Sequence, residues 1–459
     1  MRILLIQPAK QSISLGGEEV FLYEPLALEY IAAGVSKDHD VMIFDQRLEK
    51  NLPDAIEKFN PQIIGITSYS VHVNPVKKLF EQIKILKPGI LTVVGGHHAT
   101  IIPEDFLSPS IDLIVMGEGV FTFKEIVTRF EKGEGFDDIN GIAFEKNGKL
   151  VKTEFAKVVD LDAVPFPDRS LTAKYRKRYY SEWMKPLASI RTSKGCPFRC
   201  NFCALWKLTE GRYLKRSPAK VVEELTGIEE EYVFFADDES LVDAKRMKTL
   251  AQLIKDAGIK KRYFLYGRTD TIAKNPDLLK MWRDIGLEKV FVGLEFFRDQ
   301  DLDHIGKGTS ISDNKEAIRT LSNLGIEPYP SFIIRPEWRH EDFQELRHYC
   351  RNLGLSFAGF AVLTPLPGTD LYEQTKDQLI TNNYDYFDFI HTVLPTSLPL
   401  KDFYNEYYQL YMKAFSTFQS LSRLKKYPLK QIPNTLVKAF GFYNRLRKAY
   451  LDYDHRPAL

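Results

Sequence analysis

Residues 187–203 read LASIRTSKGCPFRCNFC, a short apolar run followed at once by three cysteines. The run predicts a buried strand, and the glycine and proline after it predict a loop. Cys196, Cys200 and Cys203 fall in that loop with the spacing C-x3-C-x2-C. Such clustering favours a metal site over disulfides in a chain with four cysteines. The stretch therefore predicts a metal-binding loop at the carboxyl end of a strand.

Apolar runs alternate with helical patterns on both sides of this stretch, which is typical of parallel α/β architecture. Six strand–helix units predict a partial (β/α)6 barrel over residues 187–385, with chemistry at the carboxyl ends of its strands. Five earlier strands predict a doubly wound, Rossmann-like domain over residues 1–141. The barrel strands are expected at 187–193, 232–237, 263–268, 289–296, 328–334 and 357–363, and the earlier ones at 2–7, 40–45, 62–67, 91–96 and 112–117.

Two further segments complete the predicted organisation. Residues 142–186 hold a hairpin with Asn-Gly at its turn and a proline-bearing linker. Residues 386–459 are expected to be helical, aromatic and basic, with eight Lys or Arg and no acid between Leu421 and Tyr450. The fold class is thus α/β, with a helical C-terminal region after the barrel.

The overall composition excludes several classes of protein. Apolar residues make up 44% and charged residues 27% of the 459 residues, as in globular proteins, and the net charge is only +2. The sequence holds no apolar stretch of roughly 18–20 residues and no cleavable signal at its start. We therefore expect a cytoplasmic protein. No recognised nucleic-acid module accompanies the basic segment, so nucleic acid is not expected as a partner.

Three cysteines on one loop suit an iron–sulfur cluster better than zinc. A cubane cluster takes one ligand per iron, so three thiolates leave one iron open for a substrate. The alternatives are a zinc site that lacks its fourth ligand, with His97 or His98 supplied from another domain, or a coincidence of free thiols. Cys350 lies in a helical pattern and is expected to be a small buried apolar residue.

The segment Cys196-Pro-Phe-Arg-Cys200-Asn-Phe202-Cys203 resembles the radical S-adenosylmethionine signature, including the aromatic residue before the third cysteine. The resemblance implies a [4Fe-4S] cluster held by the three cysteines, with Phe202 near the cofactors. It also implies that S-adenosylmethionine binds the open iron and is split by an electron to give a 5′-deoxyadenosyl radical. The electron would come from an external donor such as flavodoxin or ferredoxin.

Later segments resemble the same family's contacts to S-adenosylmethionine. By this resemblance the contacts would come from Asp237, Asp238 and Glu239 after the second barrel strand, Arg268 after the third, and Gly293 and Glu295 after the fourth. The acids could instead cap the next helix, and an ordinary salt bridge explains Arg268 equally well. The fifth strand, SFIIRPEW, departs from the glycine-rich turn of many relatives, so contacts there are not carried over.

A doubly wound domain ahead of such a barrel resembles the cobalamin-binding subclass. The residues that carry this resemblance are Thr67 and Ser68 after the third strand, Gly95, Gly96 and His97 after the fourth, and Gly117 and Glu118 after the fifth. Glycines at strand ends let a large ligand approach the backbone, although any fold of this kind has such tight turns. No D-x-H-x-x-G motif supplies an axial histidine, and His72 lacks its flanking Asp and Gly.

The two resemblances together imply a cobalamin-dependent methylase. Methylcobalamin and the 5′-deoxyadenosyl radical would together methylate an unactivated carbon of a small-molecule, lipid or tetrapyrrole-like substrate. One alternative is a cyclase or oxidative rearrangement enzyme without methyl transfer, as in the anaerobic porphyrin-ring cyclase of this subclass. Another is a cobalamin-binding sensor or carrier with an inactive barrel. The basic C-terminal region could contact a membrane surface or form a solvated helical face over the barrel mouth.

Overall fold

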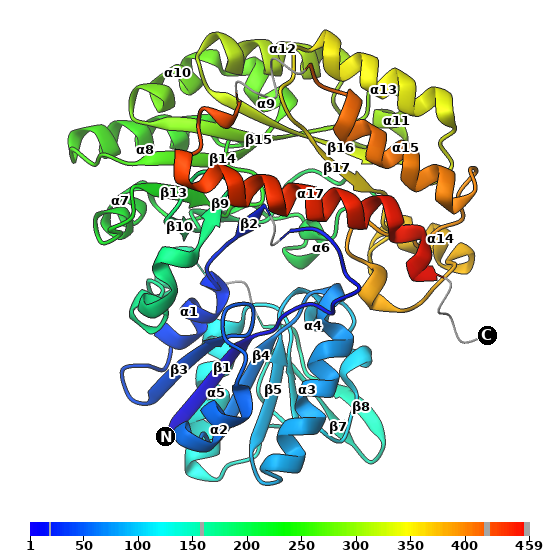
Figure 1. Ribbon diagram of the computed structural model, residues 1–459. Helices are drawn as coiled ribbons and strands as arrows, with labels where there is room; N and C mark the ends of the chain where they lie inside the picture. The colour runs from blue at the N-terminus through cyan, green and yellow to red at the C-terminus, as the bar shows by residue number, and fades with distance from the viewer. Residues whose placement is uncertain (18–19, 157–159, 417–422, 454–459) are drawn as a thin grey trace.

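The chain folds into two α/β units whose sheets lie one above the other in Figure 1. The computed structural model describes residues 1–17, 20–156, 160–416 and 423–453. The N-terminal unit carries a seven-stranded sheet, and the second unit carries a six-stranded parallel sheet. Two small antiparallel pairs accompany them, β2 (Phe21–Leu22) with β9 (Tyr180–Ser181), and β11 (Ser193–Lys194) with β12 (Leu214–Lys215).

The first sheet has the strand order β3-β1-β4-β5-β6-β7-β8. Successive residues of β1 face opposite layers, with Ile3 and Leu5 in one core and Leu4 and Ile6 in the other. Burial on both faces explains the uninterrupted apolar runs of these parallel strands. The elements are β1 (Arg2–Gln7), β3 (Asp40–Asp45), β4 (Ile63–Thr67), β5 (Leu91–Gly95), β6 (Leu113–Val115), α1 (Leu26–Ala33), α2 (Leu52–Phe59), α3 (Val73–Leu86), α4 (His97–Ile101) and α5 (Gly119–Lys132).

The predicted hairpin forms as β7 (Ile142–Lys146) and β8 (Lys149–Lys152). Asn147 and Gly148 at its turn both have positive φ, as a two-residue hairpin turn requires. The sequence placed this hairpin outside the N-terminal domain, whereas β7 pairs with β6 and extends the first sheet. Strand β7 pairs with the backbone groups at the edge of β6, which would otherwise be unpaired. The Asn-Gly turn in the sequence predicts the hairpin but not this pairing.

The second sheet follows chain order, β10-β13-β14-β15-β16-β17, and every neighbouring pair is parallel. It is a half-barrel with β10 and β17 as its edges, as the six units predicted. Its strands are β10 (Leu187–Ile190), β13 (Tyr232–Phe235), β14 (Arg262–Arg268), β15 (Leu287–Glu295), β16 (Glu327–Ile334) and β17 (Gly359–Val362). Its helices are α6 (Leu205–Leu208), α7 (Pro218–Thr226), α8 (Ala244–Asp256), α9 (Thr269–Lys274), α10 (Pro276–Asp284), α11 (Asp299–His304), α12 (Ile311–Asn323) and α13 (His340–Asn352).

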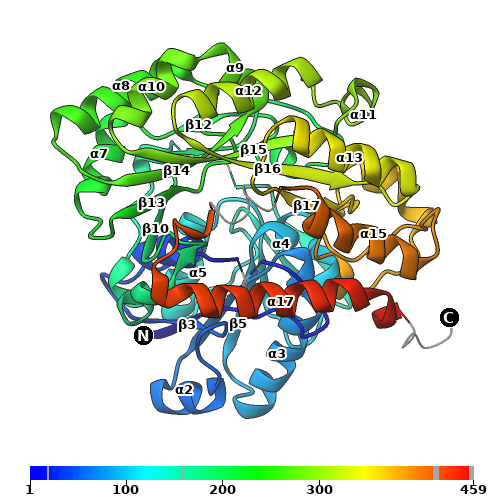
Figure 2. The same ribbon diagram turned by 45° about the horizontal axis from the view of Figure 1, so that its top comes forward.

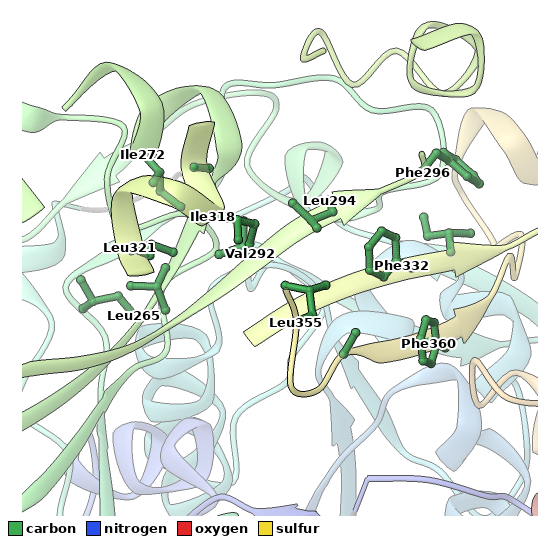
Figure 3. Close-up of a cluster of buried hydrophobic side chains, with 14 of the residues drawn as sticks. Leu265, Ile272, Val292, Leu294, Phe296, Ile318, Leu321, Phe332, Leu355 and Phe360 are labelled. Atoms are coloured by element: carbon green, nitrogen blue, oxygen red, sulfur yellow. The ribbon is translucent and has the colours of Figure 1, made fainter. Parts of the chain in front are cut away.

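Figure 3 shows how the half-barrel packs against its outer helices. Val292 and Leu294 of β15 meet Ile318 and Leu321 of α12, and all four side chains are buried. Burying such side chains contributes about 1.5–3 kcal/mol each relative to exposure. This layer fixes the strands, and therefore the loops at their carboxyl ends.

Helix α14 (Asp370–Thr375) follows β17, and the C-terminal region after it is helical, as the sequence predicted, with α15 (Leu400–Lys413) and α17 (Ile432–Lys448). Helix α17 packs against α15 and lies across the outside of the molecule in both views (Figures 1 and 2). Within the described ranges, no helix is both long and apolar enough to cross a membrane.

The predicted linker contains a ten-residue 3-10 helix, η4 (Arg169–Arg178), that ties the two units together. Arg176 pairs with Glu24 of the N-terminal unit and, at 2.6 Å, with Glu230 of the barrel unit. Arg169 donates to Glu224 at 2.9 Å and to the carbonyl of Ser189 at 2.5 Å. The Arg176 guanidinium is shared between the two units and helps to fix how the two sheets face each other.

We expect Arg176→Met to destabilise the protein, because Glu24 and Glu230 lose their shared cation. Breaking a buried pair on one side costs about 3 kcal/mol or more. Calorimetric unfolding measures the effect, and Arg129→Met is the matched control because its partners Glu125 and Asp138 are exposed. Equal stability of the two variants would contradict the role given to Arg176.

Candidate active site between the two sheets

The cysteine loop is fastened to the strand beside it by two carboxylates. Asp237, just after β13, accepts hydrogen bonds from the backbone N–H groups of Thr192 and Ser193 at 2.7 and 2.8 Å and from the Thr192 hydroxyl at 2.6 Å. Asp238 accepts from the backbone N–H of Gly195 at 2.6 Å. Neither of these two acids caps the following helix α8, whose N-cap residue is Asp243. Both oxygens of Asp237 bind the loop instead.

The three cysteines occupy the loop between β11 and α6, and none is in a disulfide. Burial raises the pKa of Cys196 to about 11 and that of Cys203 to about 12. Burial also raises the pKa of Cys200, against the opposing effect of Lys307 and Arg268. The thiols interact with one another, but within the described parts of the chain no three potential metal ligands converge as a ready coordination site. Phe202 is half-buried and packs against the barrel core.

A cation and an unsatisfied carboxylate lie beside the cysteine loop. The Arg268 guanidinium is 3.5 Å from the centroid of the Phe198 ring and also pairs with Asp270 at 3.0 Å. Glu239 accepts with Oε1 from the Arg268 backbone at 3.1 Å and from Thr271 at 3.0 Å. Its Oε2 is buried with no hydrogen-bond partner, and burial raises the pKa of Glu239 to about 7. A buried acceptor of this kind calls for a donor from a ligand.

The end of β15 forms a compact acid–base pair. Glu295 has a positive φ of 61°, and its Oε1 accepts from Lys307 Nζ at 2.6 Å. A Cβ on Gly293 would collide with the Glu295 carboxylate and lie 2.9 Å from Lys307 Nζ. Gly293 is therefore needed for space, and Glu295 is oriented by Lys307.

Glycine turns of the N-terminal unit line a small cavity of about 170 Å³, which Arg191, Lys194 and Asp238 line from the barrel unit. We call it the N-terminal cavity, and it is lined by Thr67, Gly95, Gly96, His97, Gly117 and Glu118, among others. Gly96 has φ +104°, and a Cβ there would lie 2.8 Å from Ser68 N, Ser68 O and Thr67 Oγ1. This is the close approach that only glycine permits.

The structure separates the histidines and hydroxyls that the sequence grouped together. Ser68 is fully buried, and its backbone N–H donates a hydrogen bond to Gly95 O at 2.8 Å. His98 is held by Asp105 at 2.7 Å and Ser70 at 3.0 Å, so both ring nitrogens are occupied. His97 faces the cavity, and burial, with Arg191 and Lys194 nearby, lowers its pKa to about 4. Its imidazole is thus neutral near pH 7.

A larger cavity of about 860 Å³, the interdomain cavity, brings the two groups of residues together. Thr67 and His97 line it from the N-terminal unit. From the barrel it is lined by Asp237, Asp238, Glu239, Arg268, Gly293 and Glu295. Residues from the carboxyl ends of both sheets therefore meet in one space.

Sequence reasoning missed two cations at this junction. Arg191, directly after β10, lines both the N-terminal and the interdomain cavities. Lys194, next to the cysteine loop, pairs with Glu118 of the other unit at 2.8 Å. The position of Arg191 at the end of the first barrel strand was a usable signal. The pairing of Lys194 was not, because it depends on how the two units dock.

Comparisons with known proteins agree with this division of the chain. The family model "B12 binding domain" matches residues 15–127, and "Radical SAM superfamily" matches residues 190–353. The structure of the cobalamin-dependent S-adenosylmethionine radical enzyme OxsB, with aqua-cobalamin and S-adenosylmethionine bound, superimposes with a TM-score of 0.71. It is 18% identical, over 98% of this chain and 72% of that one.

Two relatives are similar over most of their length. The hopanoid C-3 methylase of Methylococcus capsulatus is 30% identical over 414 residues, 88% of this chain and 78% of that one. The anaerobic magnesium-protoporphyrin IX monomethyl ester cyclase of Rubrivivax gelatinosus is 30% identical over 418 residues, 86% and 73% of the two chains. Fold and matches define a class, the radical S-adenosylmethionine enzymes that also bind cobalamin.

The chain belongs to this cobalamin-binding radical S-adenosylmethionine family, and its cofactors are a [4Fe-4S] cluster, S-adenosylmethionine and cobalamin. The predicted fold class and cofactors are confirmed. The residues present fit these groups, with three thiolate donors on one loop, an unsatisfied Glu239 oxygen and a cradle at Gly96 that a Cβ would fill.

We expect Gly96→Ala to weaken cobalamin binding by about tenfold, because its Cβ intrudes on Ser68 and Thr67 in a backbone conformation that costs a side chain about 1–3 kcal/mol. Absorbance titration with hydroxocobalamin measures the affinity. Gly89→Ala is the control, since nothing lies within 4 Å of its Cβ. Unchanged affinity in Gly96→Ala would remove this turn from the cobalamin site.

Proposed function

We propose that the protein methylates an unactivated carbon of a small-molecule or lipid-like substrate held in the interdomain cavity. The observation that carries the proposal is the meeting of Thr67 and His97 with Glu239, Arg268 and Glu295 around one space. When bound, the cluster and S-adenosylmethionine supply a hydrogen-abstracting radical, and cobalamin supplies the methyl group. A carbon placed between them could lose a hydrogen atom and receive a methyl group without moving far.

Seven barrel residues have roles that their positions and contacts support. Cys196, Cys200 and Cys203 would hold the cluster, and Glu239 Oε2 would accept from the ammonium group of S-adenosylmethionine. Arg268, beside the cysteine loop, would meet the carboxylate of S-adenosylmethionine with a guanidinium edge. Asp237 and Asp238 would act as positioning residues, since they bind the loop backbone.

On the N-terminal side, the roles follow the lining of the N-terminal cavity. Gly95, Gly96 and Gly117 would let the nucleotide tail of cobalamin approach the backbone, with hydrogen bonds from Thr67. Glu118 is engaged with Lys194 and would hold the cysteine loop against this cavity. His97 would present a neutral imidazole near the corrin rather than a charged group.

The barrel side of the interdomain cavity favours an apolar substrate. Tyr23, Phe234, Tyr266 and Phe291 line it, and neighbouring rings are in contact, as with Tyr23 and Phe234 at 4.6 Å between centroids. Aromatic walls exclude water and stabilise an apolar carbon skeleton. Exclusion of water also protects a reactive radical from side reactions.

The central test is anaerobic incubation of the reconstituted, reduced protein with methyl-labelled S-adenosylmethionine and a lipid extract of cells that express it. We expect 5′-deoxyadenosine, S-adenosylhomocysteine and a labelled product. Cys200→Ala should abolish 5′-deoxyadenosine release and the cluster absorbance. Cys350→Ala, at a buried position in α13, is the matched control and should retain both.

Other outcomes separate the alternatives. Oxidation of an extract component without incorporation of label would favour a cyclase reaction. The 30% identical relative from Rubrivivax gelatinosus is named as a cyclase. Cobalamin binding without any 5′-deoxyadenosine would favour a sensor or carrier with an inactive barrel. Either result would overturn methyl transfer.

Two partners beyond the substrate belong to the same proposal. The chain has four cysteines, too few for a second cluster, so the electron would come from an external donor such as flavodoxin or ferredoxin. A reduced iron–sulfur site of this kind is suited to the cytoplasm. A membrane surface is the second partner, since Leu429, Val437 and Phe440 of the C-terminal region are 85%, 70% and 75% exposed among basic residues.

We expect the protein to sediment with vesicles that contain phosphatidylglycerol and not with pure phosphatidylcholine vesicles, because the basic residues need anionic lipid. The double variant V437S/F440S should lose most of this binding. Phe121→Ser, an exposed aromatic on α5, should bind as the unmodified protein does. Equal binding of all three proteins would exclude α17 as the contact.

A further inference from the structure

A second large cavity, separate from the cofactor residues, lies at the open side of the half-barrel. Its volume is about 640 Å³, within the range of small-molecule sites. One wall is the segment before β10, with Tyr180 and Lys185, and another is the start of β17, with Gly359 and Phe360. Helices α15 and α17 supply the remaining cover. We call this cavity the lateral chamber.

The lateral chamber adjoins the interdomain cavity. Gly16, Gly17, Phe21 and Ile390 line both cavities. No cysteine and none of the strand-end residues proposed to hold cofactors lines the chamber. Its position therefore suits the part of a substrate that does not react.

A continuous series of aromatic rings runs from the chamber to the interdomain cavity. Phe357 and Tyr329 line the chamber, with ring centroids 5.1 Å apart. Tyr329 lies 5.4 Å from Phe291, which lies 5.0 Å from Tyr266, and these two line the interdomain cavity. Rings at these separations form an unbroken apolar surface. An elongated apolar body could contact this surface along its whole length.

The charges of the chamber are not balanced. Glu182 is the single carboxylate among the described residues that line the chamber, and it is already paired with Lys289 and Arg423. Lys185 and Lys438 lie over the same Tyr180 ring, 5.5 and 4.9 Å from its centroid. Across the described residues, no carboxylate pairs with either ammonium. Burial lowers the pKa of Lys185, and the nearby cations Lys438 and Arg178 add to this effect.

We propose that the lateral chamber binds the body of an anionic amphiphile, with its carboxylate or phosphate between Lys185 and Lys438 and its apolar part along the aromatic series. This inference rests on the proposed function and names the substrate class for it. The head group stays at the exposed rim, where Lys185 and Lys438 reach solvent, and the distal carbon enters the interdomain cavity. The exposed face of α17 would place this rim at a membrane surface.

The test measures binding of the fluorescent fatty acid cis-parinarate to the full chain. Oleate and monooleyl phosphate are the competitors that distinguish a carboxylate from a phosphate head, and oleyl alcohol is the uncharged control. We expect one of the two anions to compete at least tenfold better than the alcohol. The double variant K185Q/K438Q should bind parinarate about tenfold more weakly, as the loss of two exposed ion pairs predicts.

Substitutions that fill the chamber provide a second, steric test. A Cβ on Gly359 would lie 3.8 Å from the Tyr329 ring and 3.9 Å from Pro330 O, so Gly359→Ala should bind normally. Gly359→Phe should abolish binding, and Ala439→Trp fills the chamber from α17 if the first variant fails to fold. K430Q/K448Q removes two cations that do not line the chamber and should leave parinarate binding unchanged.

The outcome is distinguishable from failure of the proposed function. If Gly359→Phe releases 5′-deoxyadenosine but transfers no methyl group, the chamber holds the substrate. Equal parinarate binding in Gly359→Phe, Ala439→Trp and the unmodified protein would overturn the proposal, as would equal competition by oleyl alcohol and both anions. If the unmodified protein releases no 5′-deoxyadenosine, the proposed radical chemistry is rejected. The parinarate measurements then test the lateral chamber independently.

Discussion

The cysteine loop depends on two carboxylates at the end of the neighbouring strand. Asp237 accepts three hydrogen bonds from residues 192 and 193, and Asp238 accepts one from Gly195. These hydrogen bonds give acceptors to backbone N–H groups beyond the end of β10, and burial raises the pKa of both carboxyl groups. Because β13 packs in the barrel core, the two aspartates after it hold the loop in a fixed position relative to the sheet. The backbone around the cysteines is therefore positioned before any cofactor binds.

The docking of the two units is the second condition for the site. Arg176 joins Glu24 to Glu230, and Lys194 joins the cysteine loop to Glu118. These pairs are the reason that residues from two separate sheets line one cavity. A substrate carbon must reach both the methyl donor and the radical source, so the proposed reaction depends on how the two units are placed relative to each other.

Much of this architecture could be predicted from the sequence, because its determinants are local. Apolar runs such as RILLIQ and YFLYGR predict the strands, and the spacing of Cys196, Cys200 and Cys203 predicts the iron–sulfur cluster. What could not be predicted depends on contacts between distant residues. The sequence could not show that Asp237 holds the loop while Glu239 keeps a free oxygen, since both follow the same strand. Nor could it show the lateral chamber, which forms only when α17 packs against α15 and faces β17 across the cavity.

The two strands missing from the half-barrel have a consequence for how such an enzyme can change. A closed eight-stranded barrel fills its interior with its own side chains. The open side here is bounded instead by the segment that carries α15 and α17, whose described residues line the lateral chamber and not the interdomain cavity. Replacing that segment would reshape the space offered to a molecule while leaving every strand end untouched. Selectivity and reactivity are thus carried by different stretches of the chain and can diversify independently.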